Sequence, residues 1–165
     1  MITISNATSK DLKLIKDIAY ATWPDVYGKI LSKEQLTFML TAFYSEETLS
    51  DNMINKMHHF ILVYDEAICL GFASYEHNYL GKKETRLHKI YLLPEAQGKG
   101  AGRALIDVVA SYATENESNC ISLNVNRFNN ACTFYQKMGF TIVGEEDIAI
   151  GHGYLMEDYK MEKQL

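Results

Sequence analysis

The sequence predicts an α+β fold in which a mixed, mostly antiparallel central sheet is flanked by helices. Three strand patterns follow one another in the middle of the chain without a helix between them, unlike the regular strand–helix alternation of parallel folds. The length of 165 residues suits one hydrophobic core. Neither a repeat nor a low-complexity tract divides the chain, so we expect a single domain over residues 1–165.

The first third of the chain predicts one strand and three helices. Residues 1–4 alternate between apolar and polar, and Thr8 or a neighbouring polar residue can cap the helix that follows. We expect the segment 21–28 to break this helix. Two further helical patterns come next, one that begins at Ser32 and one over about residues 46–57.

Three strands are predicted in the middle of the chain. Residues 60–64 and 68–75 form two of them, joined by a tight turn at residues 65–66. A polar loop then leads to the central strand, whose apolar and aromatic residues 89–93 suit a strand buried in a sheet. Pro94 ends the hydrogen-bond ladder of this strand.

The last third predicts a strand, a helix and a pair of strands. Residues 120–125 form the strand, and a polar turn leads to a helix over 131–137, after which Gly139 suits a left-handed position. The chain closes with strand patterns at 140–143 and 153–161, and we expect an acidic loop between them.

A glycine-rich turn follows the central strand. Gln97-Gly98-Lys99-Gly100-Ala101-Gly102 places three glycines in five residues, so the backbone can curl without Cβ clashes and a ligand can lie directly against it. A helix pattern begins at about Gly100. Its apolar residues recur at three- and four-residue spacing and form one buried stripe: Leu105, Val108, Val109 and Tyr112.

The start of this helix is suited to an anion. Its first amide groups lack partners inside the helix, and the aligned peptide dipoles make this end partly positive. Lys99 and Arg103 add positive charge, while the first acid, Asp107, lies about two turns inside. The local field therefore favours a phosphate or a pyrophosphate. The nucleotide P-loop pattern is absent, and Arg103 stands where a dinucleotide fingerprint needs its third glycine.

The remaining pattern, Gln97-x-x-Gly100-x-Gly102 between a strand and a helix, resembles the coenzyme A pyrophosphate loop of the GCN5-related N-acetyltransferases (GNAT). The run from Asn129 to Phe140 looks like the second motif of that family. The resemblance covers about residues 60–161. Within the family, the run from His88 to Pro94 and the end of the chain are most similar to bacterial polyamine acetyltransferases of the PaiA type.

The resemblance implies a GNAT-like fold and an enzyme that moves the acetyl group of acetyl-CoA to a primary amine by direct transfer in a ternary complex. It places the backbone of the central strand against the pantetheine and the glycine-rich turn around the pyrophosphate. The implied cofactor-binding residues are Ile90, Tyr91, Leu92, Gln97, Gly98, Lys99, Gly100, Ala101, Gly102 and Arg103.

The second motif implies two further contacts with the coenzyme. An asparagine near the helix start binds coenzyme A, and the position of the family's asparagine does not choose among Asn126, Asn129 and Asn130 here. We favour Asn129 and then Asn130, and helix caps or turn formers are the alternative interpretation. The tyrosine that stands near the sulfur of the coenzyme is Tyr135.

Acetyl transfer needs a stabilised oxyanion and a proton for the departing thiolate. The amide of Tyr91 or Leu92 would face the thioester oxygen. Tyr135 would protonate the thiolate, which is uphill by roughly 2 kcal/mol from free pKa values of about 10 and 8.5. Water exclusion raises the pKa of the thiol and can close this gap. The alternative is that Tyr135 only packs against Phe140 or the coenzyme.

The acceptor amine also needs a base, because about one alkylamine in 10³ is neutral at pH 7. Glu76, at the end of the strand before the central one, is our first choice. His88 has the better intrinsic pKa. Strict alternation, however, places His88 on the same face as Ile90 and Leu92, which predicts that it points into the core.

The acceptor itself is less constrained by the sequence. By the resemblance, Trp23, Tyr27 and Tyr44 would line a substrate pocket, and the alternative is that they are core aromatics. A small polyamine-like amine is our first expectation, while an amino acid, an aminoglycoside and the N-terminus or a lysine of a protein stay open. A coenzyme sensor or degenerate enzyme without turnover is the main alternative, and a loop that binds another phosphate ligand is the second.

Composition limits the other classes of partner. The chain has 16 Lys and Arg against 21 Asp and Glu, a formal net charge of -5, which argues against nucleic acid and mildly for cationic partners. No apolar stretch suits a signal peptide or a membrane span, so we expect a cytoplasmic protein. Many family members are dimers, which leaves a homodimer open.

No metal site is expected. The adjacent His58 and His59 diverge on a helix and face opposite sides on a strand, so they do not form a ligand pair. The three cysteines have no metal-binding spacing, and we interpret Cys69, Cys120 and Cys132 as reduced packing residues.

Overall fold

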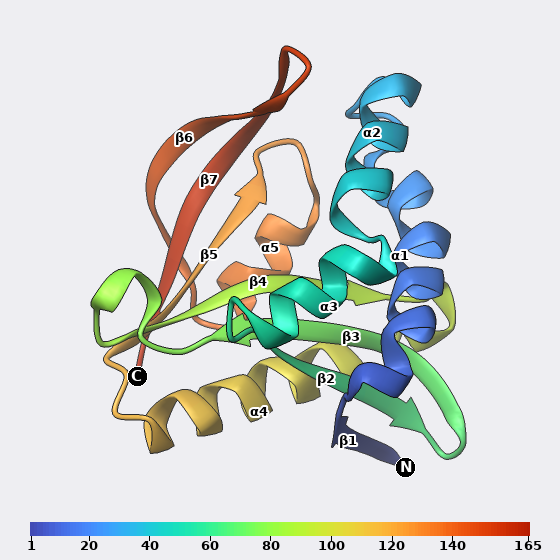
Figure 1. Cartoon of the computed structure of the whole chain (residues 1–165). Coiled ribbons are helices and arrows are strands. Elements are labelled where there is room, and N and C mark those ends of the chain that lie inside the picture. The colour runs from blue at the N-terminus through green and yellow to red at the C-terminus, as the bar shows by residue number, and fades with distance from the viewer.

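The computed structural model describes all 165 residues and is built on a seven-stranded sheet (Figure 1). The strand order is β1-β2-β3-β4-β5-β7-β6, and every neighbouring pair is antiparallel except β4 and β5. This confirms the predicted α+β fold with a mixed, mostly antiparallel sheet. The elements are β1 (Ile2–Asn6), α1 (Leu12–Tyr27), α2 (Lys33–Phe43), α3 (Glu46–Ile54), β2 (His59–Asp65), β3 (Ile68–Glu76), β4 (Glu84–Leu92), α4 (Ala101–Glu115), β5 (Cys120–Asn126), α5 (Ala131–Lys137), β6 (Thr141–Gly151) and β7 (Tyr154–Gln164).

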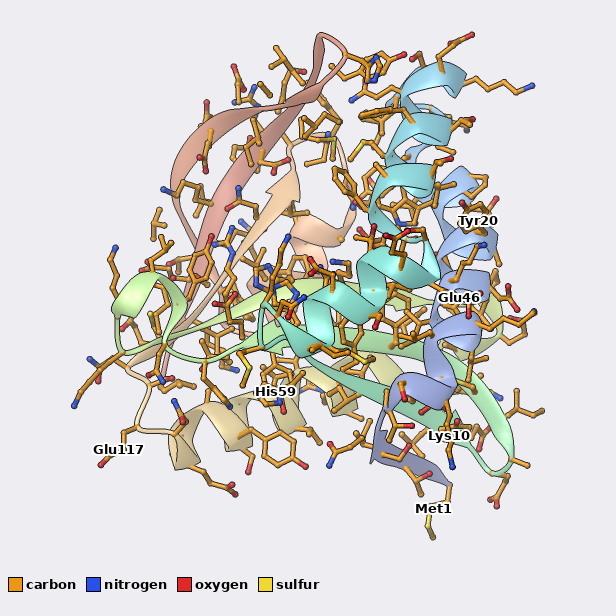
Figure 2. The ribbon with its side chains drawn as sticks, viewed as in Figure 1. Met1, Lys10, Tyr20, Glu46, His59 and Glu117 are labelled. Atoms are coloured by element: carbon orange, nitrogen blue, oxygen red, sulfur yellow. The ribbon has the colours of Figure 1, made fainter.

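The helices cover the two faces of the sheet as two separate layers (Figure 1). Helices α1, α2 and α3 share one apolar cluster with one face, in which Ile15, Trp23 and Leu49 are buried. Helices α4 and α5 share a second cluster with the other face, in which Leu105 and Val109 form the predicted stripe. Figure 2 shows charged side chains on the outer surface, such as Glu46 and Glu117. No helix is long and apolar enough to cross a bilayer.

The sheet opens between β4 and β5. These two parallel strands pair only through Glu84–Arg86 and Cys120–Ser122, and beyond that point they diverge. In Figure 1, β5, β7 and β6 rise away from the half of the sheet formed by β1 to β4. The edge of β4 from Leu87 to Leu92 therefore has no strand on its β5 side. A sheet that splits in this way exposes backbone donors and acceptors to a ligand.

A β-bulge in β4 changes which side chains face this opening. Neighbouring residues of β3, Ser74 and Tyr75, pair with Lys89 and Leu87, so His88 is an extra residue without a partner. The bulge interrupts the two-residue alternation of the strand. The expectation that His88 shares the core face with Ile90 and Leu92 is therefore wrong. His88 instead stacks on His58, next to the end of α3.

Two other local predictions are wrong. Helix α1 does not break in the segment 21–28 but continues to Tyr27 with Pro24 inside it. Proline removes one helical hydrogen bond and leaves the carbonyl of Tyr20 without its donor. Both Pro24 and Tyr20 are exposed, so water reaches this carbonyl, while Trp23 is buried on the inner face of the same turn.

The acidic stretch after residue 143 is a strand and not a loop. Strand β6 continues to Gly151 because its whole length pairs with β7. Ile148 and Ile150 pack against the cluster of α1–α3, and Arg127 binds the carboxylates of Glu145 and Asp147 at 3.1 and 2.9 Å. Cross-strand pairing therefore offsets the low strand propensity of these acids.

Candidate active site

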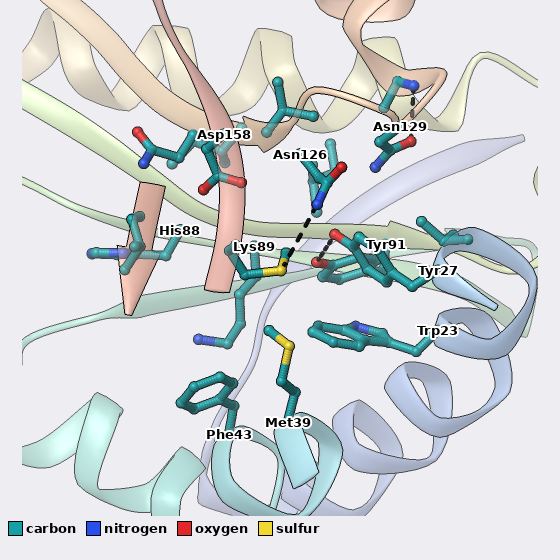
Figure 3. A pocket seen from close by; sticks show the side chains of 18 of the residues that line it. Trp23, Tyr27, Met39, Phe43, His88, Lys89, Tyr91, Asn126, Asn129 and Asp158 are labelled. Atoms are coloured by element: carbon teal, nitrogen blue, oxygen red, sulfur yellow. Dashed lines mark hydrogen bonds between the residues drawn. The ribbon is translucent and has the colours of Figure 1, made fainter. Parts of the chain in front are cut away.

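A cavity of about 320 Å³ lies where β4 and β5 diverge. Helices α1 and α2 form one wall, and β4, β5, α5, β6 and β7 form the others. Figure 3 shows the side chains of these elements turned toward a common space. Most of the residues predicted from the sequence to contact substrate or the reacting end of the coenzyme line it: Trp23, Tyr27, Tyr44, His88, Ile90, Tyr91, Leu92, Asn129 and Tyr135.

A groove of about 480 Å³ lies between the first turn of α4, with the loop before it, and the end of α5. Leu92 lines both hollows, so they lie end to end at the last residue of β4. The groove is lined by most of the predicted loop, namely Gln97, Gly98, Gly100, Ala101, Gly102 and Arg103. Lys137 of α5 adds a second cation that the sequence did not single out.

Two predicted cofactor residues lie outside both hollows. The ammonium of Lys99 is turned to the Asp65 carboxylate, 2.8 Å away. Asn130 is exposed and makes no side-chain cap on α5, whereas the Asn129 Oδ1 accepts from the Ala131 amide at 2.9 Å. Of the two asparagines, only Asn129 is positioned at the cavity.

The glycines of the turn create a concave row of free amides. Gly98 and Gly100 have φ angles of 77° and 74°, the left-handed region that glycine adopts without strain. The amides of Gly98 and of residues 100–103 donate to no carbonyl. A Cβ at Gly102 would stand 3.0 Å from Phe134 and 3.2 Å from Leu92, so this glycine allows α4 to pack closely. No acid lies in the first turn of α4. The loop therefore fits a diphosphate.

Tyr135 of α5 lines the aromatic cavity. It is 7% exposed and packs edge-on against Phe140, at 5.7 Å between ring centroids. Its hydroxyl has no hydrogen-bond partner in the protein. Burial raises the pKa of Tyr135 well above its ordinary value, so the hydroxyl stays protonated at neutral pH. An unpaired donor on a residue of the cavity wall is available to a ligand.

The aromatic wall is both part of the core and the lining of the cavity. Trp23 lies 4.5 Å from Tyr27 and 5.4 Å from Tyr44 between ring centroids, and all three are nearly buried. The hydroxyl of Tyr27 is hydrogen-bonded to that of Tyr91 at 3.0 Å (Figure 3). The three rings are therefore packed in the core and also form part of the cavity wall.

Glu76 and His88 lie together, although only His88 lines the cavity. The His88 Nε2 is 2.9 Å from the Glu76 Oε1, and the His58 Nε2 is 3.4 Å from the same oxygen. The two imidazole rings are stacked at 4.0 Å. Burial, assisted by nearby cations, lowers the pKa of His58 to about 4 and that of His88 to about 3. Both rings are therefore neutral at pH 7. The Nε2–H of His88 donates a hydrogen bond to the Glu76 carboxylate, which orients the ring.

The donor atoms of His58, Glu76 and His88 lie within 4.8 Å of one another, as metal ligands can. The positive charges of Lys56 and Lys89 nearby oppose a divalent cation at this position. His59 takes no part, because its ring stacks on Tyr75 at 5.2 Å. The rings of His58 and His59 therefore stack on different partners, His88 and Tyr75.

Two charged residues of the cavity were missed by the sequence analysis. Lys89 lies over the ring of Tyr44 at 5.6 Å, and its Nζ is 3.4 Å from the Asn52 Oδ1. Burial lowers the pKa of Lys89 to about 8. Asp158 of β7 is 6% exposed, and burial raises the pKa of its carboxyl to about 6. Its place in an acidic stretch resembles that of a surface residue, so no local signal marks it.

Comparison with known proteins agrees with this geometry. The sequence profile described as Acetyltransferase (GNAT) domain matches residues 29–163. The chain is 26% identical to the uncharacterized N-acetyltransferase YuaI of Bacillus subtilis, over 95% of this chain and 90% of that protein. It is 23% identical to a spermidine N(1)-acetyltransferase of Thermoplasma acidophilum, over 94% of this chain and 96% of that protein.

The fold is also found in a solved structure. The PaiA N-acetyltransferase of Thermoplasma acidophilum, crystallised in complex with coenzyme A, superimposes with a TM-score of 0.84 at 24% identity and covers 100% of this chain and 99% of its own. Because the family profile covers most of the sequence, the resemblance drawn from the glycine-rich turn is confirmed. The chain belongs to the GNAT family and is an N-acetyltransferase that uses acetyl-CoA.

Proposed function

We propose that this protein transfers the acetyl group of acetyl-CoA to a primary amine of a small molecule, directly and in a ternary complex. The observation that supports this most strongly is the position of the two hollows, because the groove at the start of α4 and the aromatic cavity that holds Tyr135 both have Leu92 in their walls. Two substrates can therefore approach the same point from opposite ends. A polyamine such as spermidine is the first acceptor to test, since one relative carries that name and the net charge of -5 suits a cation.

The residues of the groove hold the coenzyme in this proposal. The free amides of residues 100–103 bind the diphosphate, and Arg103 and Lys137 add charge on its two sides. The edge of β4 from Ile90 to Leu92, which lacks a strand on its β5 side, binds the pantetheine through its backbone groups. Asn129 contributes a side-chain contact from the start of α5.

Bound acetyl-CoA supplies an acetyl group activated as a thioester. The amide of Tyr91 or Leu92 donates to the oxygen that becomes negative in the tetrahedral intermediate. Tyr135 holds the proton that the departing sulfur needs, and its unpaired hydroxyl belongs to a residue of the cavity wall. The aromatic wall of Trp23, Tyr27 and Tyr44 excludes water, which raises the pKa of the thiol toward that of the tyrosine.

Glu76 and His88 remain our proposed route for the amine proton on the β4 side. Glu76 is outside the cavity wall, so it acts on an acceptor only through His88. Because the Nε2–H of His88 donates its hydrogen bond to Glu76, the Nδ1 is the only ring nitrogen that can take a proton from the amine. Its lowered pKa of about 3 makes that nitrogen a weak base. A more basic group in the same cavity would therefore take the amine proton more readily than His88 does.

Release of free thiol from acetyl-CoA over a panel of amines tests this proposal. The panel contains spermidine, an amino acid, an aminoglycoside and a peptide with a free N-terminus, with reactions lacking an amine as the control. We expect thiol release that saturates with a small amine. Binding of acetyl-CoA without release with any amine would support a sensor, and release only with the peptide would support a protein acetyltransferase.

A further inference from the structure

Asp158 is a buried carboxylate with an unused oxygen. It lies on β7 opposite Asn126 of β5, and its side chain reaches the cavity beside His88, Lys89 and Asn126 (Figure 3). The residue is 6% exposed, and its Oδ1 has no hydrogen-bond partner. Leaving a buried polar atom unpaired costs about 1–3 kcal/mol, and more when it is charged. A carboxylate in a cavity wall with an oxygen that the protein leaves unpaired is suited to a cationic ligand.

The cations of the protein do not satisfy this carboxylate. No basic nitrogen lies within 4.0 Å of it. Arg127 binds the acids of the β6–β7 hairpin, and Arg86 donates to the Asn124 Oδ1 at 2.7 Å. The Lys89 ammonium is turned to Asn52 and the ring of Tyr44. The positive partner of Asp158 is therefore missing from the chain itself.

We propose that Asp158 forms the acceptor subsite of this enzyme, where its carboxylate binds the ammonium group of the substrate amine and takes one proton from it. This inference rests on the proposed function and adds a named acceptor residue to it. The chemical class of the ligand is a primary alkylammonium. The aromatic rings of Trp23, Tyr27 and Tyr91 line the same cavity and offer their faces and edges to the rest of the ligand.

The protons balance over one turnover. The ammonium N–H bond breaks, the Asp158 carboxylate becomes a carboxylic acid, and the neutral amine forms its C–N bond with the acetyl carbon. The C–S bond then breaks as the sulfur gains a proton from Tyr135, and the second amine proton passes to the Nδ1 of His88. Asp158 and His88 return their two protons to solvent and Tyr135 takes one back, so each acetylated ammonium yields amide, free thiol and one proton.

The surroundings of Asp158 bring the pKa of its carboxyl close to neutral pH, where a carboxylate can both take up and release a proton. Burial is the main cause that raises its pKa to about 6, and Asn124 opposes this by hydrogen bonding. That value is well above the pKa of about 3 for His88 and below that of about 8 for Lys89. The charged and titratable groups facing Asp158 are Arg86, His88 and Lys89 on β4, Arg127 after β5, Cys132 and Tyr135 on α5, Glu146 on β6 and Tyr27 on α1.

The test compares Asp158→Asn with wild type in the thiol-release assay between pH 5 and 8, using the amine that the wild type acetylates best. The matched control is Glu157→Gln, the neighbouring position on β7, which is 48% exposed and points outward. We expect Asp158→Asn to lower kcat/KM by about 100-fold or more, the range of general-base catalysis. We also expect the wild type and the control to lose activity as the pH falls through about 6, and the variant to lack this limb.

A wild type that turns over while Asp158→Asn keeps both its rate and its acid limb overturns the assignment of Asp158 alone. A wild type that releases no thiol with any amine overturns the proposed function and this inference together. Thermal unfolding and binding of coenzyme A show whether the variant is folded. If it is not, the wild-type profile decides: a limb near pH 6 supports the assignment, and constant activity down to pH 5 overturns it.

Discussion

Tyr135→Phe separates catalysis from stability more cleanly than other changes at this site. The Tyr135 hydroxyl has no partner in the protein, so its removal breaks no internal hydrogen bond. The ring is 7% exposed and keeps its packing against Phe140 as phenylalanine. We therefore expect the free energy of unfolding to change by less than about 0.5 kcal/mol, as for a neutral substitution. Affinity for coenzyme A should change by less than about threefold, which is about 0.6 kcal/mol.

Turnover should respond very differently. Proton transfer by a positioned side chain contributes about 10²- to 10⁴-fold to the rate. Loss of that contribution raises the activation free energy by about 3–5 kcal/mol. The assay is thiol release at saturating substrates, with calorimetric titration of coenzyme A and thermal unfolding on the same samples. The control is Tyr20→Phe, on the exposed side of α1. A rate for Tyr135→Phe within threefold of wild type would refute the role of this hydroxyl.

Three further predictions test the loop, the histidine pair and helix α1. Gly100→Ala should raise the Kd of coenzyme A at least tenfold and lower the free energy of unfolding by about 1–2 kcal/mol, because alanine is strained at a left-handed φ of 74°. The control Gly81→Ala, at a left-handed φ of 72° in an open loop, should lose similar stability and leave that Kd unchanged. Calorimetric titration measures the Kd and thermal unfolding measures the stability. His58 and His88 have folded pKa values of about 4 and 3, below the unfolded value of 6.5, so stability should fall as the pH drops from about 6.5 toward 3. Urea unfolding at pH 7 and 5 checks this, and His88→Gln should be less sensitive to pH; equal slopes would contradict it. Pro24→Ala should raise the free energy of unfolding by about 1–3 kcal/mol, because alanine restores a helical hydrogen bond. Thermal unfolding measures this, and a melting temperature below that of the wild type would contradict it.

The glycine-rich turn could be predicted from the sequence because its requirements are local. Three glycines allow the backbone to curl whatever lies around them, and two of them do have positive φ. Tyr135 was singled out by the resemblance of residues 129–140 to a family motif, and it lies on one short helix, α5. The N-cap of α2 at Ser32 was also a local signal, and its side chain accepts from the Gln35 amide at 3.1 Å. Such features need few neighbours from distant parts of the chain.

The missed features depend on pairing between distant segments. The direction of His88 is set by the register of β4 against β3, where one unpaired residue inverts the expected face. Asp158 reaches the cavity only because β7 pairs with β5 at Asn126. The continuation of α1 through Pro24 depends on the burial of Trp23 against the sheet. In each case tertiary packing determined the outcome, which local patterns do not contain.

The most direct test of the account is a crystal structure of this protein with coenzyme A. The account predicts that the diphosphate oxygens lie within hydrogen-bond distance of the amides of residues 100–103 and that the sulfur lies at the junction near Leu92, facing the Tyr135 hydroxyl. A diphosphate bound elsewhere, with those amides turned to water or to a protein side chain, would contradict it.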